Sequence, residues 1–271
     1  MRGASRAAVA AAQDELAAAV RGDPAAATAI GDELFGVTSL LDSEPALRRA
    51  LTDATSPAGA RTGLVRGLLG GRVGRATLDL VAGMVSSRWS APRDLASAAE
   101  RLAVMATAAA ADSAGQLDDL EDELFRFGRI VAGQPELGAA RASPLLPADR
   151  KRGLLDALLA DRVSPAALRL ISEVAVHPRG RSLVESLEEY ARLAAAWRQR
   201  LVAVVRVAAA LSSGQRDRLA AALEAAYGRG IHLNIVVDPA VVGGMSVQIG
   251  DEFIDGSVAS RLAALRRRLA A

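Results

Sequence analysis

The amino-acid sequence predicts a mostly helical α+β protein, with two tandem fused helical bundles followed by a small C-terminal β-α-β-β-β-α domain. Of its 271 residues, 51% are apolar but only 3% are aromatic, so the core must consist mainly of Ala, Leu and Val. Ala and Leu are strong helix formers. From Leu201 onward the apolar spacing changes to an alternation of two residues, which is the period of a β-strand. We expect domains at residues 1–111, 112–200 and 201–271.

The helical part contains an internal repeat with a shift of 90 residues. The stretches that begin with DELF at Asp32 and at Asp122 share about 18 of 50 positions without a gap, well above chance in so Ala- and Leu-rich a chain. Pro45 and Pro135 also match, and proline favours the first turn of a helix. Each copy is therefore predicted to contain a long helix, a short helix after the proline, and two further helices.

The long helices are expected at about residues 23–42 and 114–132, from their apolar spacing. The last two helices of each copy divide near Arg72 and Arg162. The stretch before each copy is also predicted to be helical. The second of these, RDLASAAERLAVMATAAAA, closes the first bundle and can also open the second. A final helix is expected at about 182–197, with an apolar stripe of Leu183, Leu187 and Tyr190.

One helix in each copy carries more apolar surface than a one-sided amphipathic helix needs. In RATLDLVAGMVSSRW, Leu80 and Met84 form a second apolar stripe, and Leu170 and Val174 repeat it in the later copy. A helix that is apolar on two sides is either buried centrally or offers one side to a partner helix. Both interpretations stay open at this point.

The C-terminal domain begins with a β-branched run, LVAVVRVAA, of strand length. A helix follows, with Ser212 and Gln215 at capping-box spacing and Gly228 as its stop. IHLNIVVD and MSVQIGDEFID then alternate as strands, and the second turns at Gly250-Asp251, a two-residue hairpin signal.

Two further features complete this domain. Gly243 and Gly244 stand at the entrance of a strand, which suggests a bulge or a close backbone contact. Ser257 is a good N-cap for a last helix, whose apolar stripe is Val258, Leu262, Leu265 and Leu269.

The sequence argues against an enzyme and against a cofactor or metal site. It has no Cys and two His, His177 and His232, and no Gly-Lys-Ser/Thr of a phosphate-binding loop. The acidic run Asp118–Glu123 lacks the spacing of a calcium loop and is expected at a solvated helix start.

Charge and hydropathy limit the possible partners. The sequence pI is about 9.6, but the net charge is only +2 because 31 acidic residues are interspersed with 33 basic ones. Such a surface does not favour nucleic acid. The longest clean apolar run, Leu102–Ala111, is short of the roughly 20 residues that span a bilayer. We therefore expect a membrane to be reached only through a partner, and we expect no signal peptide.

The C-terminal stretch contains an ordered set of motif residues. They are Asp238, Pro239, Gly243, Gly244, Val247, Ile249, Gly250, Asp251, Ile254, Asp255, Gly256 and Ser257, with Leu262 and Leu265 in the last helix. In these residues the stretch resembles the delta subunit of bacterial rotary ATP synthases, the counterpart of the mitochondrial oligomycin-sensitivity-conferring protein. Family members usually carry one N-terminal bundle, and the second copy of about 90 residues is similar to the enlarged delta region of actinobacterial synthases.

The resemblance implies a non-catalytic stator subunit at the cytoplasmic face of the plasma membrane. Its helical part is expected to bind the alpha subunits of the catalytic head, and its terminal domain is expected to bind the b subunits of the peripheral stalk. The stalk subunit is expected to be a separate chain. A helical-repeat adaptor of another complex is the alternative, and a nucleic-acid-binding protein a more distant one. The candidate partner-binding residues are Leu80, Met84, Leu170 and Val174 in the helical part, and Gly243, Gly244, Asp255 and Gly256 in the terminal domain.

Overall fold

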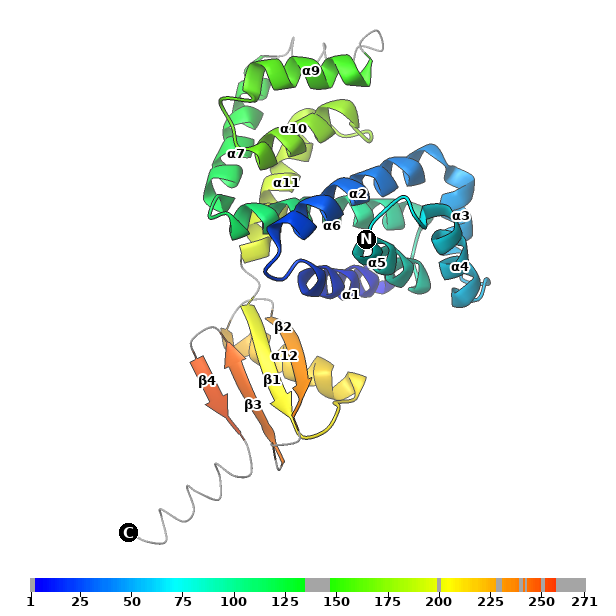
Figure 1. The fold of residues 1–271 in the computed structure, drawn as a ribbon, viewed down its shortest axis with the longest axis vertical. Helices are drawn as coiled ribbons and strands as arrows, with labels where there is room; N and C mark the ends of the chain where they lie inside the picture. The colour runs from blue at the N-terminus through cyan, green and yellow to red at the C-terminus, as the bar shows by residue number, and fades with distance from the viewer. Residues whose placement is uncertain are drawn as a thin grey trace. The chain divides into compact units, whose positions relative to one another are not determined.

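The computed structural model describes residues 3–134, 147–198, 201–227, 231–238, 241, 243–249 and 252–256. They form two compact units, Met1–Trp197 and Arg198–Ala271. The first is helical and the second contains a mixed four-stranded sheet (Figure 1). This confirms the predicted mostly helical α+β fold class.

Most helices of the first unit that follow one another within the described residues are joined by short turns, and several begin at a proline, as the sequence predicts. Pro24, Pro45, Pro92 and Pro165 each occupy the first helical turn, where the missing N–H costs nothing. The helices are α1 (Gly3–Ala19), α2 (Pro24–Ser43), α3 (Pro45–Thr52), α4 (Ala58–Leu69), α5 (Arg75–Ser86), α6 (Pro92–Ser113), α7 (Leu117–Ala132), α9 (Ala148–Leu159), α10 (Pro165–Val176) and α11 (Leu183–Arg198).

The repeat of the sequence is also a repeat of the structure. Helices α9 and α10 have the bounds of α4 and α5 moved by 90 residues, and α7 and α11 correspond in the same way to α2 and α6. One hydrogen bond is repeated as well. The carboxylate of Glu33 accepts from the backbone N–H of Gly74 at 2.8 Å, and that of Glu123 accepts from Ser164 at 2.9 Å. Each bond spans 41 residues and ties the long helix of a copy to the start of α5 or of α10.

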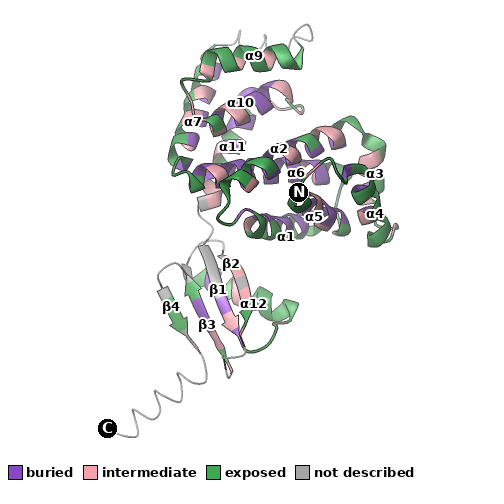
Figure 2. Cartoon of the chain, viewed as in Figure 1, coloured by how far each residue is buried: buried purple, intermediate pink, exposed green. Residues whose placement is uncertain are grey.

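Helix α6 belongs to both copies, as the sequence suggested. Shifted by 90 residues it corresponds to α1, and it contacts α1, α2, α3 and α5 on one side of the repeat and α7 and α10 on the other. Fourteen of its residues are buried, most of them alanines, so neighbouring helices can approach closely (Figure 2). The hydrophobic core runs without a break across residue 111. The boundary predicted between residues 111 and 112 thus falls inside one core, and a division there stays a prediction.

The second unit is the predicted strand–helix–three-strand module. Its elements are β1 (Leu201–Val207), α12 (Ser213–Tyr227), β2 (Ile231–Val237), β3 (Met245–Ile249) and β4 (Glu252–Asp255). The sheet order is β2-β1-β3-β4, with β1 parallel to β2 and the other pairs antiparallel. A small core of Val205, Val207, Leu223 and Val247 holds α12 against the sheet.

Two local predictions in this unit are confirmed. Ser212 accepts from the N–H of Gln215 while the Gln215 side chain accepts from the N–H of Ser212, which is a capping box. Ile249 pairs with Glu252, so two residues connect β3 to β4. The short helix expected after Pro135, the stop at Gly228 and the last helix from Ser257 lie outside the described residues.

Candidate partner-binding site

The four helix residues predicted to bind partners lie in the core of the helical unit. Leu80 and Met84 on α5 are 3% and 1% exposed, and Leu170 and Val174 on α10 are 0% and 1% exposed. Of the two interpretations that the sequence left open, the buried core helix describes their place in this chain. Their role in binding remains a prediction, and it requires a partner to displace the helices that cover them.

A small apolar cleft opens beside α5 in the first copy. Its volume is about 20 Å³, close to the space that one water molecule needs, and most of the side chains that line it are buried. Its lining includes Val81 and Val85, which lie one turn apart on α5 and form its other apolar stripe. The full lining is Val37, Leu40, Leu41, Leu47, Leu51, Val65, Leu68, Leu69, Val81, Val85 and Leu95.

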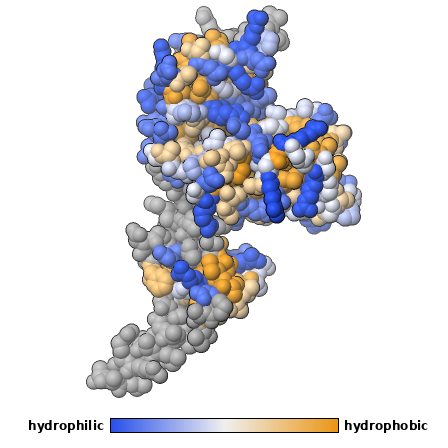
Figure 3. Space-filling view, in the orientation of Figure 1, coloured by the Kyte–Doolittle hydropathy of each residue, from blue (hydrophilic) through white to orange (hydrophobic). Residues whose placement is uncertain are grey.

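Each copy also presents one pair of leucines to solvent. Leu64 and Leu68 on α4 are 41% and 40% exposed, and their equivalents on α9, Leu154 and Leu158, are 54% and 55% exposed. Residues four apart share one helix face, and apolar side chains gathered on one face indicate an interaction surface. Figure 3 shows such apolar patches between charged residues of the helical unit. The repeated pattern GLVRGLL and GLLDALL is the sequence signal for this surface.

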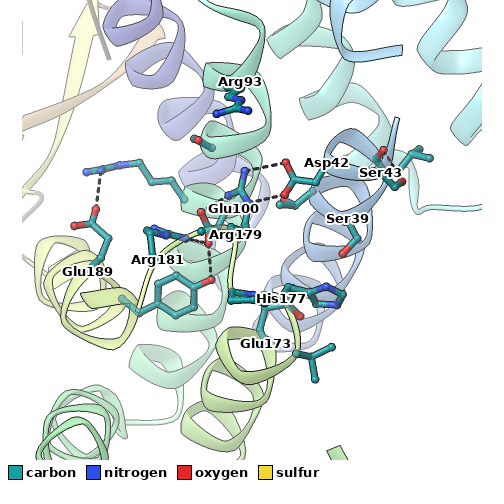
Figure 4. Close-up of a pocket in the computed structure, with 18 of the residues that line it drawn as sticks. Ser39, Asp42, Ser43, Arg93, Glu100, Glu173, His177, Arg179, Arg181 and Glu189 are labelled. Carbon is teal, nitrogen blue, oxygen red and sulfur yellow. Dashed lines mark hydrogen bonds and ion pairs between the residues drawn. The ribbon is translucent and has the colours of Figure 1, made fainter. Parts of the chain in front are cut away.

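A cluster of charged side chains around the buried Glu100 joins the two copies (Figure 4). Glu100 on α6 is 6% exposed and accepts hydrogen bonds from Arg179, from Arg181 and from the Tyr190 hydroxyl, the last at 2.9 Å. Arg179 also pairs with Asp42 at the end of α2, with 3.2 Å between Nη2 and Oδ1. The cluster therefore ties α2, α6, α11 and the loop after α10 together.

The backbone at this loop takes an uncommon conformation. Arg179 has a φ of 50° and Gly180 a φ of 75°, and a non-glycine residue in this region costs of the order of 1 kcal/mol or more. The two carboxylates that Arg179 binds offset that cost.

Burial and charge shift the pKa values within the cluster. Burial raises the pKa of Tyr190 well above 10, and the nearby charge of Glu100 adds to the effect. For Arg179, burial opposes the charge, but the hydrogen bond to Asp42 and the charge of Glu100 outweigh it and raise the pKa. Both groups stay protonated at neutral pH, so neither can serve as a general base.

The cluster lines a cavity of about 1010 Å³ with charges of both signs. His177, at the end of α10, lies on its wall with Nε2 3.4 Å from a guanidinium nitrogen of Arg152. Throughout the described ranges, no group of three or more His, Asp or Glu side chains is arranged to hold a metal ion. The described helices also include none that is long and apolar enough to cross a membrane.

The glycines singled out in the C-terminal domain shape one end of the β3–β4 hairpin. Gly244 has a φ of 78°, which favours glycine. Gly256 donates its N–H to the carbonyl of Met245 at 3.0 Å, and a Cβ on Gly256 would lie 3.1 Å from that oxygen. Gly243 precedes β3, and Asp255 ends β4, where it pairs with Ser246. The positions fit a structural role, and their contact with a partner remains a prediction.

The sequence did not indicate the exposed apolar side chains of this sheet. Val236 and Val237 on β2 are 41% and 51% exposed, and Phe253 and Ile254 on β4 are 56% and 42% exposed. Strands β2 and β4 are the two edges of the sheet. Edge strands with apolar side chains are surfaces on which another chain can pack.

Comparison with known proteins assigns a family to this fold. Residues 99–269 match the family described as "ATP synthase delta (OSCP) subunit". The match begins within α6, the helix that both copies share, and covers the second copy and the C-terminal unit. The first copy lies almost entirely outside it.

Several relatives match over the whole chain, the first copy included. The "ATP synthase subunit delta" of Acidothermus cellulolyticus is 47% identical over 100% of both chains, and that of Streptomyces griseus 49% over 100% of both. That of Thermobifida fusca is 50% identical over 91% of this chain and 92% of its own. A chain of the Toxoplasma gondii mitochondrial ATP synthase hexamer covers 62% of this chain at 19% identity, but its TM-score of 0.28 supports no argument.

The relatives span the duplicated helical part as well as the sheet module, so the enlarged form is common to them. The resemblance seen around Gly243–Ser257 is confirmed by a match that extends over most of the chain. The chain therefore belongs to the ATP synthase delta (OSCP) subunit family.

Proposed function

We propose that this subunit is a non-catalytic stator part of a proton-translocating rotary ATP synthase. The helical unit binds the alpha subunits of the catalytic head, and the C-terminal unit binds the b subunits of the peripheral stalk. The chain thereby keeps the head from turning with the rotor. It is held at the cytoplasmic face of the plasma membrane through these partners, and it has no active site of its own.

The observation that carries this proposal is the division into two compact units with separate cores. Each unit has exposed apolar side chains of its own: the leucine pairs of α4 and α9 in one, and the edge strands β2 and β4 in the other. A chain with two independent contacts raises the effective concentration of the second contact once the first has formed. This arrangement suits a link between two different neighbours.

Resistance to torque requires that the helical unit deform little. Its core is continuous through both copies, and the Glu100–Arg179–Asp42 cluster joins helices from both. Close-packed interiors have low compressibility and transmit strain. These features support a mechanical function.

Complex formation with purified components tests the proposal. The full-length chain is mixed with the catalytic head, with the soluble part of a b subunit, or with both, and the mixtures are separated by size-exclusion chromatography. We expect two binary complexes and one ternary complex. Competition between head and stalk for the chain, or binding of only one of them, contradicts the proposal. The chain alone is expected to release no phosphate from ATP.

A further inference from the structure

The first and second copies differ in how they cover one helix face. Phe125 on α7 is 60% exposed, whereas its repeat equivalent on α2, Phe35, is 2% exposed. Both phenylalanines end the same tetrapeptide, DELF. Figure 1 shows α7 along the outer edge of the helical unit. Equivalent phenylalanines of the repeat are therefore buried in the first copy and exposed in the second.

Residues of the second copy cover Phe35. The guanidinium carbon of Arg169 on α10 lies 4.6 Å from the centre of the Phe35 ring, and the Tyr190 ring on α11 lies 6.5 Å away. Arg169 also forms an ion pair with Asp32, one turn before Phe35. Asp32 and Phe35 thus bind an arginine by charge and by stacking together. The second copy has no following copy to do the same for its own long helix.

The face of α7 keeps the groups that bind an arginine in the first copy. Asp122 and Phe125 repeat Asp32 and Phe35, and Asp122 is exposed. Arg129 stands where the first copy has Ser39 and is also exposed. Asp122, Phe125 and Arg129 follow at spacings of three and four residues, so they lie on one helix face over about 10 Å.

Another molecule of this same protein does not fit this face of α7. To cover Phe125 as the second repeat copy covers Phe35, that molecule must present the repeat equivalents of Arg169 and Tyr190. Those equivalents are Asp79 and Glu100. Asp79 would bring a like charge to Asp122, and Glu100 is buried in the charged cluster. The occupant must therefore be a different chain, with a cation where Asp79 stands.

We propose that this face of α7 docks a helix from a neighbouring subunit of the ATP synthase, with an arginine that stacks on Phe125 and pairs with Asp122. The same helix carries an Asp or Glu roughly 10 Å further along, opposite Arg129. The inference rests on the proposed function for its source of partners. The contact is additional to the leucine pairs and to the edge strands of the sheet.

Photocrosslinking in the assembled synthase identifies the occupant. The full-length chain is produced with the photoreactive amino acid p-benzoylphenylalanine in place of Phe125 and incorporated into the complex. We expect a crosslink to one other subunit, at a peptide with an arginine within about one helical turn of the crosslinked residue. A crosslink within this chain, a crosslink to another molecule of the same protein, or no crosslink in an intact complex overturns the inference.

Binding measurements supply a second, independent test. Asp122→Arg should weaken binding of the full-length chain to delta-depleted synthase on the order of tenfold, and Phe125→Ala should weaken it in the same direction. Asp156→Arg, the same charge change at an exposed position of α9, is the matched control and should bind like the wild type. If wild-type affinity persists in both α7 variants, the inference is wrong although the proposed function stands. If the wild-type chain itself does not bind, the proposed function fails first. Because Phe125 is exposed, an unchanged circular dichroism melting curve confirms that its variant is folded.

Discussion

Glu100 on α6 joins the two copies through its hydrogen bonds. It stands within an Ala-rich helix and is 6% exposed, yet three side chains from residues 179 to 190 satisfy its carboxylate. A charged residue in a buried helix is a sequence signal for a polar cluster. Its partners lie 79 to 90 residues away, so no local pattern could have named them.

The Tyr190 hydroxyl makes this cluster sensitive to alkaline pH. The pKa of Tyr190 is raised by burial and by Glu100, so the folded state holds the phenolic proton more tightly than the unfolded state. Its contribution to stability is fully present below the unfolded pKa near 10 and falls as the pH rises through it, by at most about 1.4 kcal/mol per pH unit.

Urea unfolding at about pH 9 and about pH 11 measures this effect. We expect the wild type to lose more free energy of unfolding over this interval than Tyr190→Phe, which has no phenolic proton at this position. Equal losses in the two proteins would show that the hydroxyl does not couple stability to pH.

At the scale of single elements, helix starts are fixed by the same contact in both copies. Glu33 and Glu123 each accept the N–H at the start of a helix 41 residues later, and Glu123 also accepts from the Ser164 hydroxyl at 2.7 Å. Glu33→Ala and Glu123→Ala should each lower the free energy of unfolding by about 1 kcal/mol, as the loss of an N-cap does.

Glu44→Ala provides the control for these two variants. Glu44 occupies the N-cap position of α3 but makes no side-chain cap hydrogen bond, so its removal should change stability by less than about 0.5 kcal/mol. Urea unfolding followed by circular dichroism compares the three. If Glu44→Ala lowers the free energy of unfolding as much as the other two variants do, a general helix-dipole effect explains all three losses. The repeated hydrogen bond is then not their cause.

We expect the exposed leucine pairs to distinguish the two copies in binding. Leu68 borders the apolar cleft of the first copy, so we expect Leu64→Asp with Leu68→Asp to weaken binding of the catalytic head by roughly tenfold. Leu154→Asp with Leu158→Asp is the matched pair in the second copy and should weaken it less. Because all four side chains are exposed, the melting temperature should hardly change. Equal effects of the two pairs would assign both copies the same part in binding the head.

At the scale of the whole molecule, periodicity and punctuation allowed most of the fold to be predicted. The proline positions gave helix starts, the shift of 90 residues gave the repeat, and two-residue alternation gave the sheet. The family followed from an ordered motif, and the match over residues 99–269 confirms it. These features are local in the chain, so the sequence displays them directly.

The candidate site was harder to predict because it depends on what covers each helix. Two apolar stripes on α5 could indicate a groove or a core, and the structure buries Leu80 and Met84. Phe35 and Phe125 look alike in the sequence, and only packing against Arg169 and Tyr190 separates them. The exposure of a side chain depends on which helices pack against it. In a repeat, equivalent residues can have different neighbours, so similar sequences do not predict similar exposure.

Hydrogen–deuterium exchange of the full-length chain tests most directly the proposal that its two units bind two different partners. Exchange is followed in the free chain, with the catalytic head, with the b subunit, and with both. We expect the head to slow exchange in residues 3–197 and the b subunit to slow it in residues 201–256, with both sets of protection present together. Protection of the same unit by both partners, or of neither unit by either partner, would contradict the proposal.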